Sequence, residues 1–513
     1  MTQPMNILFL MADQLAPQFL PAYGHPVVKT PRLDGIAENS VVFDAHYTNS
    51  PLCVPARAGL MTGQLPSRIN CFDSGCDYEF SIPTLAHYLR ANGYVTAQSG
   101  KAHYIGADQL HGLEKRLTAD ICPSDNCWYG IWDDPDRTLD WFHNLKNVVT
   151  AGTVERSSQQ DHDYDATHAA VRWLYDYARG SDQRPFLLKV SFTHPHDPYV
   201  TPPQYWNRYR HDEIDMPVIP FMPVADRDEH GQWLFQHYDR NEYDVTDEHI
   251  RQARHGYYGS ISLVDDLVGQ VLDALTSARL DENTIVVFTA DHGDMLGERG
   301  AWYKMSFYEH SCRVPLFIMV PGENGSRRVS QCTSLIDLMP TLLDLVLDQG
   351  CDHLVESIDG RSLSPLMSGD ATAWCDEAVA EICFEGARAP GMLIRRGTKK
   401  YVHWEGGPCS LFDLQHDPHE KENLVTEPAY SDEIALFDKE VHERWPVEQL
   451  TEKILLKQRR NALVHQALMT GEVTALDFQP FDDASKRYYR GHGNWHKAEE
   501  RDFLRFDSKD IPE

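Results

Sequence analysis

The stretch TIVVFTADHGD, residues 284–294, sets the pattern for the whole chain. It begins with an apolar run rich in β-branched side chains, and Asp291, His292 and Asp294 follow that run directly. Unbroken apolar runs of this length are typical of strands that are buried on both faces, as in parallel sheets covered by helices. The stretch therefore predicts a buried strand whose carboxyl end carries acidic and imidazole side chains.

Similar apolar runs alternate with amphipathic stretches through the first three-quarters of the chain. The runs that predict further strands are Asn6–Met11, Tyr94–Gln98, Pro185–Phe192 and Val314–Val320. The stretches that predict helices are Pro31–Ser40, Ile82–Asn92, Ala166–Arg179 and Arg251–Ala278. Alternation of this kind indicates an α/β fold with a mostly parallel sheet flanked by helices.

The pattern changes near Gly369–Trp374, where a second unit is expected to begin. Short runs separated by turns predict a small antiparallel sheet, followed by a helix around Tyr430–Trp445. The short runs are Ala378–Phe384, Met392–Arg395, Lys400–Trp404 and Ser410–Leu414. We therefore divide the chain into a large α/β domain (1–375), a C-terminal α+β subdomain (376–475) and an extended tail (476–513).

The chain of 513 residues is strongly acidic, with 47 Lys and Arg against 77 Asp and Glu and a formal charge of −30. A field of that sign argues against nucleic acid and anionic membranes as partners, and an anionic substrate would need a locally positive pocket. The N-terminal MTQPMNILFLMADQ has no basic region, and its apolar run is too short for a signal peptide or a membrane span. The 11 cysteines lack the spacing of a disulfide framework, so we expect free thiols and a cytoplasmic protein.

Polar clusters follow four of the predicted strands at the point where each strand ends. They contain Asp13; Lys101 and His103; His194, His196 and Asp197; and Asp291, His292 and Asp294. Any one cluster is weak evidence, because such residues also cap helices and close turns. Ligands of open α/β sheets, however, bind beyond the carboxyl ends of the strands. We therefore expect the four clusters to converge on one site.

Cys53 occupies a similar position after the extended segment Asp44–Leu52. It precedes a predicted helix, and Pro55 and Arg57 lie two and four residues further on. A helix N-terminus favours anions, because its free N–H groups and its dipole point toward the ligand. From these residues alone Cys53 can be a core thiol, a nucleophile or a metal ligand.

The chemistry of the polar clusters is that of ester hydrolysis. Carboxylates and imidazole suit Ca²⁺, Mg²⁺ or Mn²⁺, buried cations hold a tetrahedral oxyanion, and histidines move protons near neutral pH. The candidates for these three roles are, in order, Asp13, Asp291 and His292; Arg57, Lys101 and Lys304; and His103 and His196. Together with a nucleophile position at Cys53, they predict hydrolysis of a sulfate or phosphate ester.

The stretch CVPARAGLMTG, residues 53–63, resembles the type I sulfatase signature C-x-P-x-R followed by a small-residue helix that ends in T-G. Further motifs of that family follow in order: GKAH (100–103), HPHDP (194–198), DHG (291–293), WYK (302–304), LFDL (411–414) and DP (417–418). Within the family the chain is most similar to the choline-sulfatase branch, through stretches such as ADQLHG (107–112) and WFHNL (141–145). The resemblance covers almost the whole chain. It implies an alkaline-phosphatase-like fold, with residues 1–375 as the catalytic domain.

The resemblance implies that Cys53 is a precursor. In such enzymes a formylglycine-generating system oxidises the motif cysteine to formylglycine, an aldehyde that is hydrated in the active site. Pro55 and Arg57 would be read partly by that system, and Arg57 would also hold the modified side chain. One hydroxyl of the hydrate would attack sulfur and the other would later expel sulfate, an exit route that a serine or a thiol lacks.

The resemblance also implies a metal site. Its ligands would be Asp13, Asp291, His292 and the modified Cys53, with Ca²⁺ as the expected ion and Mg²⁺ or Mn²⁺ as alternatives. Many sulfatases have paired aspartates in the first cluster, where this chain has Asp13 followed by Gln14. The choline-sulfatase branch resembles this single-aspartate version, so we expect an intact metal site with fewer carboxylates.

The remaining cluster residues take catalytic roles by the same resemblance. Asp291 would accept the proton of the attacking hydroxyl, and Lys101 would steady both the nucleophile and the sulfate. His103 would accept a proton when sulfate leaves. His196 and Lys304 would bind the sulfate and protonate the leaving alkoxide.

The leaving-group pocket is where this chain departs from the branch. A quaternary ammonium group is expected to meet aromatic faces and a carboxylate. Trp128, His143 and Glu385 stand where those pocket residues should be. Ser74, however, falls where asparagine is expected, and His496 falls where an aspartate is expected to reach the pocket.

The sequence therefore predicts a metal-dependent hydrolase of choline O-sulfate or a close small alkyl sulfate. The alternatives are a phosphonate monoester or phosphodiester hydrolase, a promiscuous alkyl or aryl sulfatase, and a non-catalytic binder of sulfate esters. The last explains the nucleophile position poorly. In this family the C-terminal tail packs against a neighbouring subunit. Trp495 and Phe503 are thus expected at the interface of a homodimer or homotetramer.

Overall fold

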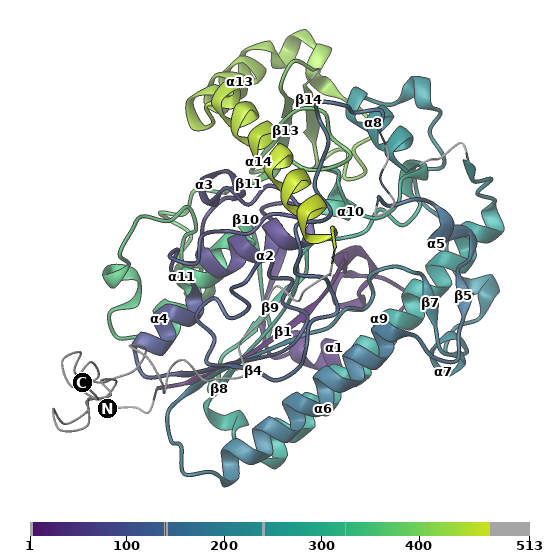
Figure 1. Cartoon of the computed structure of the whole chain (residues 1–513). Helices are drawn as coiled ribbons and strands as arrows, with labels where there is room; N and C mark the ends of the chain where they lie inside the picture. The colour runs from purple at the N-terminus through teal and green to yellow at the C-terminus, as the bar shows by residue number, and fades with distance from the viewer. Residues whose placement is uncertain are drawn as a thin grey trace, which may run out of the picture.

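The computed structural model describes residues 4–471, except 138, 140–141, 239–241, 324 and 408. His496 and the predicted tail, 476–513, lie outside the described residues. Figure 1 shows a large sheet with helices on both sides, and a smaller unit formed by the C-terminal part of the described chain.

The large sheet has eight strands in the order β10-β2-β9-β8-β1-β6-β3-β4. Their bounds are β1 Asn6–Ala12, β2 Val41–Tyr47, β3 Val95–Gly100, β4 Lys115–Arg116, β6 Phe186–Ser191, β8 Thr284–Ala290, β9 Leu316–Met319 and β10 Arg327–Ser334. Neighbouring strands run parallel except at β9, which is antiparallel to β8 and to β2. The predicted mostly parallel α/β sheet is confirmed.

Helices cover the large sheet on both sides. Figure 1 shows α6 and α9 along one side and α2, α4 and α11 along the other. The helix bounds are α1 Pro31–Ala37, α2 Cys53–Thr62, α3 Pro66–Ile69, α4 Leu85–Ala91, α5 Lys146–Val149, α6 Ser158–Arg179, α7 Pro203–Trp206, α8 Glu229–His237, α9 Asp247–Ser277, α10 Glu309–Cys312, α11 Leu338–Val346 and α12 Ser364–Ser368. Helix α6 begins earlier than predicted because Ser157 caps it, accepting a hydrogen bond from the Gln160 N–H.

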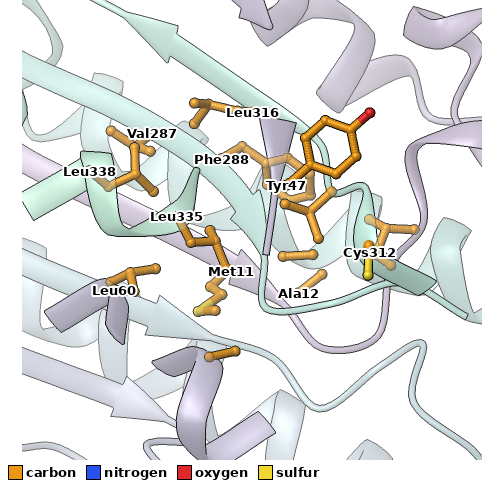
Figure 2. Close-up of a cluster of buried hydrophobic side chains, with 14 of the residues drawn as sticks. Met11, Ala12, Tyr47, Leu60, Val287, Phe288, Cys312, Leu316, Leu335 and Leu338 are labelled. Atoms are coloured by element: carbon orange, nitrogen blue, oxygen red, sulfur yellow. The ribbon is translucent and has the colours of Figure 1, made fainter. Parts of the chain in front are cut away.

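The core beside α2 fixes the position of that helix. Met11 of β1 lies beside Leu60 of α2 and Leu335, and Val287 of β8 lies beside Leu338, as Figure 2 shows. Each of these five side chains is almost fully buried. Burial of one large apolar side chain stabilises a fold by roughly 1.5–3 kcal/mol. The contacts therefore hold α2, which begins at Cys53, firmly against the sheet.

The C-terminal part forms a separate four-stranded antiparallel sheet in the order β11-β12-β13-β14, as predicted. Its elements are β11 Glu377–Ile382, β12 Gly391–Arg396, β13 Lys399–Trp404, β14 Ser410–Asp413, α13 Ser431–Arg444 and α14 Val447–Leu468. A two-stranded parallel pair, β5 Gly152–Thr153 and β7 Val200–Thr201, completes the strands of the described residues. No helix in the described part of the chain combines the length and apolarity needed to cross a membrane.

Candidate active site

The polar clusters meet at one edge of the large sheet. Strands β3, β6, β1 and β8 are parallel neighbours, so their carboxyl ends lie side by side. Asp13 follows β1, Lys101 follows β3 and Asp291 follows β8. Helix α2 brings Cys53 to the same edge, within 3.8 Å of Asp13. The structure thus gathers side chains from three strand ends and one helix at a single point.

Cys53 is buried among polar groups. Its Sγ lies 3.2 Å from His292 Nε2, 3.8 Å from Asp13 Oδ1 and 3.9 Å from Lys101 Nζ. Asp13, Cys53, Asp291 and His292 each place a potential ligand atom within 4.8 Å of the others. A thiol with these neighbours is not an ordinary core residue.

Arg57 connects the ends of the strands. Its Nε donates to Asp291 Oδ2 at 2.8 Å, and its Nη2 donates to Asp13 Oδ2 at 2.9 Å. Its Nη1 donates to the Lys101 carbonyl and to Ser191 Oγ, both at 2.9 Å. Burial disfavours the charge, but the two carboxylates outweigh it and raise the pKa of Arg57. The guanidinium is a fixed cation that orients both carboxylates.

Lys101 and Asp13 form a second buried ion pair, with 2.6 Å between Nζ and Oδ2. Burial opposes ionisation of Asp13, yet the positive charges around it, Lys101 foremost, hold its pKa well below the usual range. Burial likewise opposes the charge of Lys101, and Asp13 raises the pKa of that ammonium well above its ordinary value. Both groups are therefore charged at neutral pH.

The donor atoms around Cys53 fit a divalent cation. The Nδ1 of His292 lies 3.0 Å from the Gly293 carbonyl, which can only accept, so the lone pair is on Nε2 and faces Cys53. The Oδ1 of Asp291 accepts from the backbone N–H groups of Gln14 at 3.1 Å and His292 at 3.0 Å. Two oriented carboxylates and an imidazole lone pair suit Ca²⁺, Mg²⁺ or Mn²⁺.

A second polar cluster surrounds Lys304. Its Nζ donates to Gln14 Oε1 at 2.8 Å and lies 2.8 Å from His196 Nε2 and 3.3 Å from His143 Nε2. The Nδ1 of His196 lies 2.8 Å from the Asp197 carbonyl and so carries the proton, which leaves Nε2 to accept from Lys304. Burial, with Lys304 adding to it, holds the pKa of His143 well below the ordinary value, so His143 is neutral.

A cavity of about 460 Å³ opens over these groups. The predicted site residues that line it are Cys53, Ser74, Lys101, His103, Trp128, His143, His196, Lys304 and Glu385. We call Asp13, Arg57, Lys101, Asp291 and His292 the charged floor, and Ser74, Trp128, His143 and Glu385 the wall. One cavity therefore joins the residues predicted for catalysis to those predicted for the leaving group.

Glu385 on the wall is a buried carboxyl group that forms no ion pair with any described residue. Burial, with the charge of Asp73 adding to it, raises the pKa of Glu385 to about 8. Its Oε2 has no hydrogen-bond partner among the described residues. Ser74, next to Asp73, is buried and lines the same cavity. The wall thus holds a carboxyl group that is mostly protonated at neutral pH unless a cation lies beside it.

A hydrogen bond to its backbone N–H holds His103 in place, and its imidazole ring lies at the cavity. The Oδ2 of Asp120 accepts from the His103 N–H at 2.8 Å, and the ring meets Trp128 edge-on at 5.5 Å between centroids. Neither ring nitrogen of His103 has a hydrogen-bond partner among the described residues. Burial, with Lys101 adding to it, holds the pKa of His103 well below the ordinary value. His103 is therefore a neutral base facing the cavity.

Comparison with known proteins places the chain in a family. The family model described as Sulfatase matches residues 5–348. The chain belongs to the sulfatase family. Two further models cover the rest: "N-sulphoglucosamine sulphohydrolase, C-terminal" matches residues 297–445, and "Choline sulfatase enzyme C terminal" matches residues 452–506.

Relatives of the sulfatase include a choline-sulfatase of Rhizobium meliloti (strain 1021), 40% identical over 502 residues, which covers 96% of this chain and 97% of the relative. An arylsulfatase of Clostridium perfringens (strain 13 / Type A) is 27% identical, and the alignment covers 84% of this chain and 92% of the arylsulfatase. The solved phosphonate monoester hydrolase of Agrobacterium radiobacter has a TM-score of 0.67 at 24% identity, over 86% of this chain and 95% of that one, and shows the shared fold. The sulfatase is a sulfuric ester hydrolase.

Gln14 and Asp120 organise the site but were not assigned a role from the sequence. Gln14 has φ of 62°, and its side chain bridges Asp294 Oδ2 at 2.7 Å and Lys304 Nζ at 2.8 Å. Its place beside Asp13, where many sulfatases have a second aspartate, is the signal that could have identified it. Asp120 positions His103 from a loop that has no sequence pattern.

His194 is a supporting residue of the sulfatase and does not line the cavity. Its Nδ1 lies 2.7 Å from Asp163 Oδ2 on α6, and both side chains are buried. The contact ties the end of β6 to α6. Of the two histidines in the HPHDP motif, only His196 lines the cavity.

Proposed function

We propose that the sulfatase hydrolyses choline O-sulfate, or a close small alkyl sulfate, to the alcohol and inorganic sulfate. The observation that carries the proposal is the single cavity lined by Cys53, by Lys101 of the charged floor and, on its wall, by Trp128 and Glu385. A quaternary ammonium group binds favourably to an aromatic face and to a carboxylate, and here both occur on one wall. The 40% identical relative that is named choline-sulfatase supports the same substrate.

The residues of the floor would hold the reacting groups. Conversion of Cys53 to formylglycine supplies a hydrate, of which one hydroxyl can attack sulfur while the other can later expel sulfate. A divalent ion held by Asp13, Asp291, His292 and the modified Cys53 supplies Lewis-acid stabilisation of the oxyanion. Asp291 is proposed to accept the proton of the attacking hydroxyl. Ca²⁺ is the proposed ion because two of the donors are carboxylates, and Mg²⁺ and Mn²⁺ are the alternatives.

The cavity residues would bind sulfate and move protons. Lys101 is proposed to steady the nucleophile and the sulfate. His196 accepts a hydrogen bond from Lys304, so the proton for the leaving alkoxide would come from the ammonium of Lys304. Neutral His103, with both ring nitrogens unpartnered, is proposed as the base when sulfate leaves. On the wall, Ser74 and His143 are proposed to shape the alcohol pocket.

Three further proposals concern the whole protein. We infer a cytoplasmic enzyme because all 11 cysteines are free thiols, as expected in a reducing compartment. We propose that a formylglycine-generating system modifies Cys53. A homodimer or homotetramer and the division of the chain at residues 375 and 475 are likewise proposed.

A kinetic comparison tests the substrate. The modified enzyme with its divalent ion is assayed with choline O-sulfate, an aryl sulfate and a phosphonate monoester. We expect kcat/KM for choline O-sulfate to exceed the other two by at least about 10³-fold, since a recognised cation adds several kcal/mol of differential binding. Comparable rates with all three would reject choline while keeping the sulfatase assignment. A preference for the phosphonate would favour the phosphonate monoester hydrolase.

The mass of the peptide that contains Cys53 tests the mechanism separately. Active enzyme should contain formylglycine at that position, and the Cys53→Ala variant should lose activity by on the order of 10⁶-fold, as when other covalent nucleophiles are removed. Full activity with an unmodified thiol would overturn the mechanism. Because Cys53 lies among polar groups, the variant should unfold like the wild-type protein.

A further inference from the structure

A group of metal-binding side chains lies on the C-terminal sheet, where α13 packs on β13. Two overlapping sets each place their potential ligand atoms within 4.8 Å of one another. One set is His403, Glu405 and His442, and the other is His403, Cys409 and Asp438. None of these residues lines the cavity over Cys53. The group is therefore separate from the sulfatase site.

Asp438 determines which histidine nitrogens carry protons. The Nδ1 of His442 lies 2.8 Å from the Asp438 carbonyl oxygen, which can only accept, so the proton is on Nδ1 and the lone pair on Nε2. The Nδ1 of His403 lies 3.2 Å from Asp438 Oδ1, and a carboxylate likewise favours a proton there. One aspartate thus leaves the Nε2 atoms of both histidines as lone-pair donors, as second-shell carboxylates do in zinc sites.

The Nε2 of His403 is the second observation that points to a ligand. The His403 side chain is only 8% exposed, and its Nε2 has no hydrogen-bond partner among the described residues. The nearest acidic oxygen, Glu405 Oε2, lies 3.7 Å away, beyond hydrogen-bonding distance. Buried polar atoms are normally satisfied, so this atom calls for a partner that lies between the two side chains. A metal ion at that point would satisfy both.

We propose that His403 Nε2, Glu405 Oε2 and His442 Nε2 bind Zn²⁺ on the C-terminal sheet. Two histidines and a glutamate, with solvent in the fourth position, form a known zinc ligand set with bonds of about 2.0–2.2 Å. In tetrahedral geometry such bonds place ligand atoms roughly 3.4 Å apart, close to the present 3.7 Å between His403 and Glu405. The ion can reach the site, because the side chains of Glu405 and His442 are 37% and 53% exposed.

The alternative set with Cys409 is less suitable. A thiol binds zinc as the thiolate, and burial raises the pKa of Cys409. That set would also use His403 Nδ1, which already has Asp438 Oδ1 and Cys409 Sγ as neighbours at 3.2 and 3.6 Å. The bound ion would join His403 and Glu405 at the end of β13 to His442 on α13. It would thereby stabilise the packing of that helix on the sheet, independently of the chemistry proposed at Cys53.

Zinc binding by the full-chain enzyme tests the proposal. The protein is first saturated with Ca²⁺ and then titrated with Zn²⁺, and bound zinc and melting temperature are measured for wild type and for His442→Ala. We expect the wild type to bind one equivalent more than His442→Ala, and we expect zinc to raise the melting temperature of the wild type alone. Asp438→Asn should weaken binding by roughly 10–100-fold, as expected for a second-shell partner.

The matched control is His416→Ala. His416 is an exposed histidine of the same unit, and its Nδ1 also contacts a carboxylate, Asp413 Oδ2, at 2.8 Å. This variant should bind zinc like the wild type, and both histidine variants should keep wild-type sulfatase kinetics. Equal zinc binding by the wild type and His442→Ala would overturn the proposal. Loss of zinc in Cys409→Ser but not in Glu405→Gln would overturn the assigned ligand set.

Discussion

The floor and the wall of the one cavity are built in different ways. On the floor, Arg57 and Lys101 are each paired with a carboxylate at 2.6–2.9 Å, and the carboxylates are oriented by further hydrogen bonds. On the wall, the Oε2 of Glu385 has no hydrogen-bond partner among the described residues. The charges of the floor are paired without substrate, whereas within the described part of the chain Glu385 gains a charged partner only when a cation is bound.

The elements that carry the two regions explain this difference. The floor residues stand directly at the ends of buried strands and on α2, whose position the core fixes. Trp128 and His143 come from loops, and Trp128 has φ of 61°. Loops tolerate substitution, so a leaving-group pocket can change while the chemistry at the strand ends stays the same. Substitutions on the floor should therefore affect both folding and activity, and substitutions on the wall mainly the choice of substrate.

The largest effect is expected from Arg57→Ala. The change leaves Asp13 and Asp291 buried without their shared cation, which should weaken the folded state by about 3–5 kcal/mol. Activity should fall by at least about 10³-fold because an oriented cationic donor is lost. Urea unfolding and kcat/KM measure the two effects. Arg68→Ala is the control, because Arg68 pairs with Asp359 at 3.1 Å near the surface and should contribute less than about 1 kcal/mol. If both variants lost the same free energy of unfolding, the ion pairs of the floor would stabilise the protein no more than those at the surface, contrary to this prediction.

A smaller and more selective effect is expected from Glu385→Gln. Choline favours the ionised carboxylate, so kcat/KM for choline O-sulfate, relative to an alkyl sulfate whose alcohol group carries no charge, should rise as pH increases through the pKa of about 8. The variant should lack this rise, and its ratio should be lower by roughly 30-fold or more, the cost of about 2 kcal/mol for an unpaired buried charge. A ratio that keeps its pH dependence in the variant would exclude Glu385 as the cation partner.

The same carboxyl group should also affect stability. Its pKa is near 4.5 in the unfolded chain and about 8 in the folded protein, so the folded state binds more protons between these values. Its contribution to the free energy of unfolding therefore falls as pH rises from about 4.5 to 8. Glu385→Gln should remove that part of the pH dependence, which unfolding in urea at a series of pH values would detect.

The smallest effect is expected from Ser74→Asn. The amide adds a dipole beside the alcohol pocket, and one such interaction contributes about 0.5–1.5 kcal/mol. We expect kcat/KM for choline O-sulfate to rise by roughly 2- to 12-fold over the wild type, with little change for an aryl sulfate. Ser74→Ala controls for loss of the hydroxyl. An equal change for both substrates would show that position 74 acts on the floor and not on the leaving group.

Much of the fold was predictable because its signals are local. The apolar runs of β1, β6 and β8 are buried along their whole length, so their apolar composition alone was enough to predict them as strands. Strand β10 was missed because it is polar and partly exposed, and α14 was missed because few of its residues are buried. The antiparallel direction of β9 is set by its pairing with β2 and β8, which lie far away in the sequence.

The sequence by itself determined the chemistry at the strand ends and the identity of the cysteine that begins α2. These depend on short motifs, because a parallel sheet always brings the carboxyl ends of its strands together. Only the tertiary structure decided that Gln14 connects Lys304 to Asp294, that Glu385 Oε2 has no hydrogen-bond partner among the described residues, and that Asp438 orients His403 and His442. Those arrangements bring together loops and elements that are distant in sequence. Burial and hydrogen bonding there depend on tertiary packing, which a local sequence pattern cannot predict.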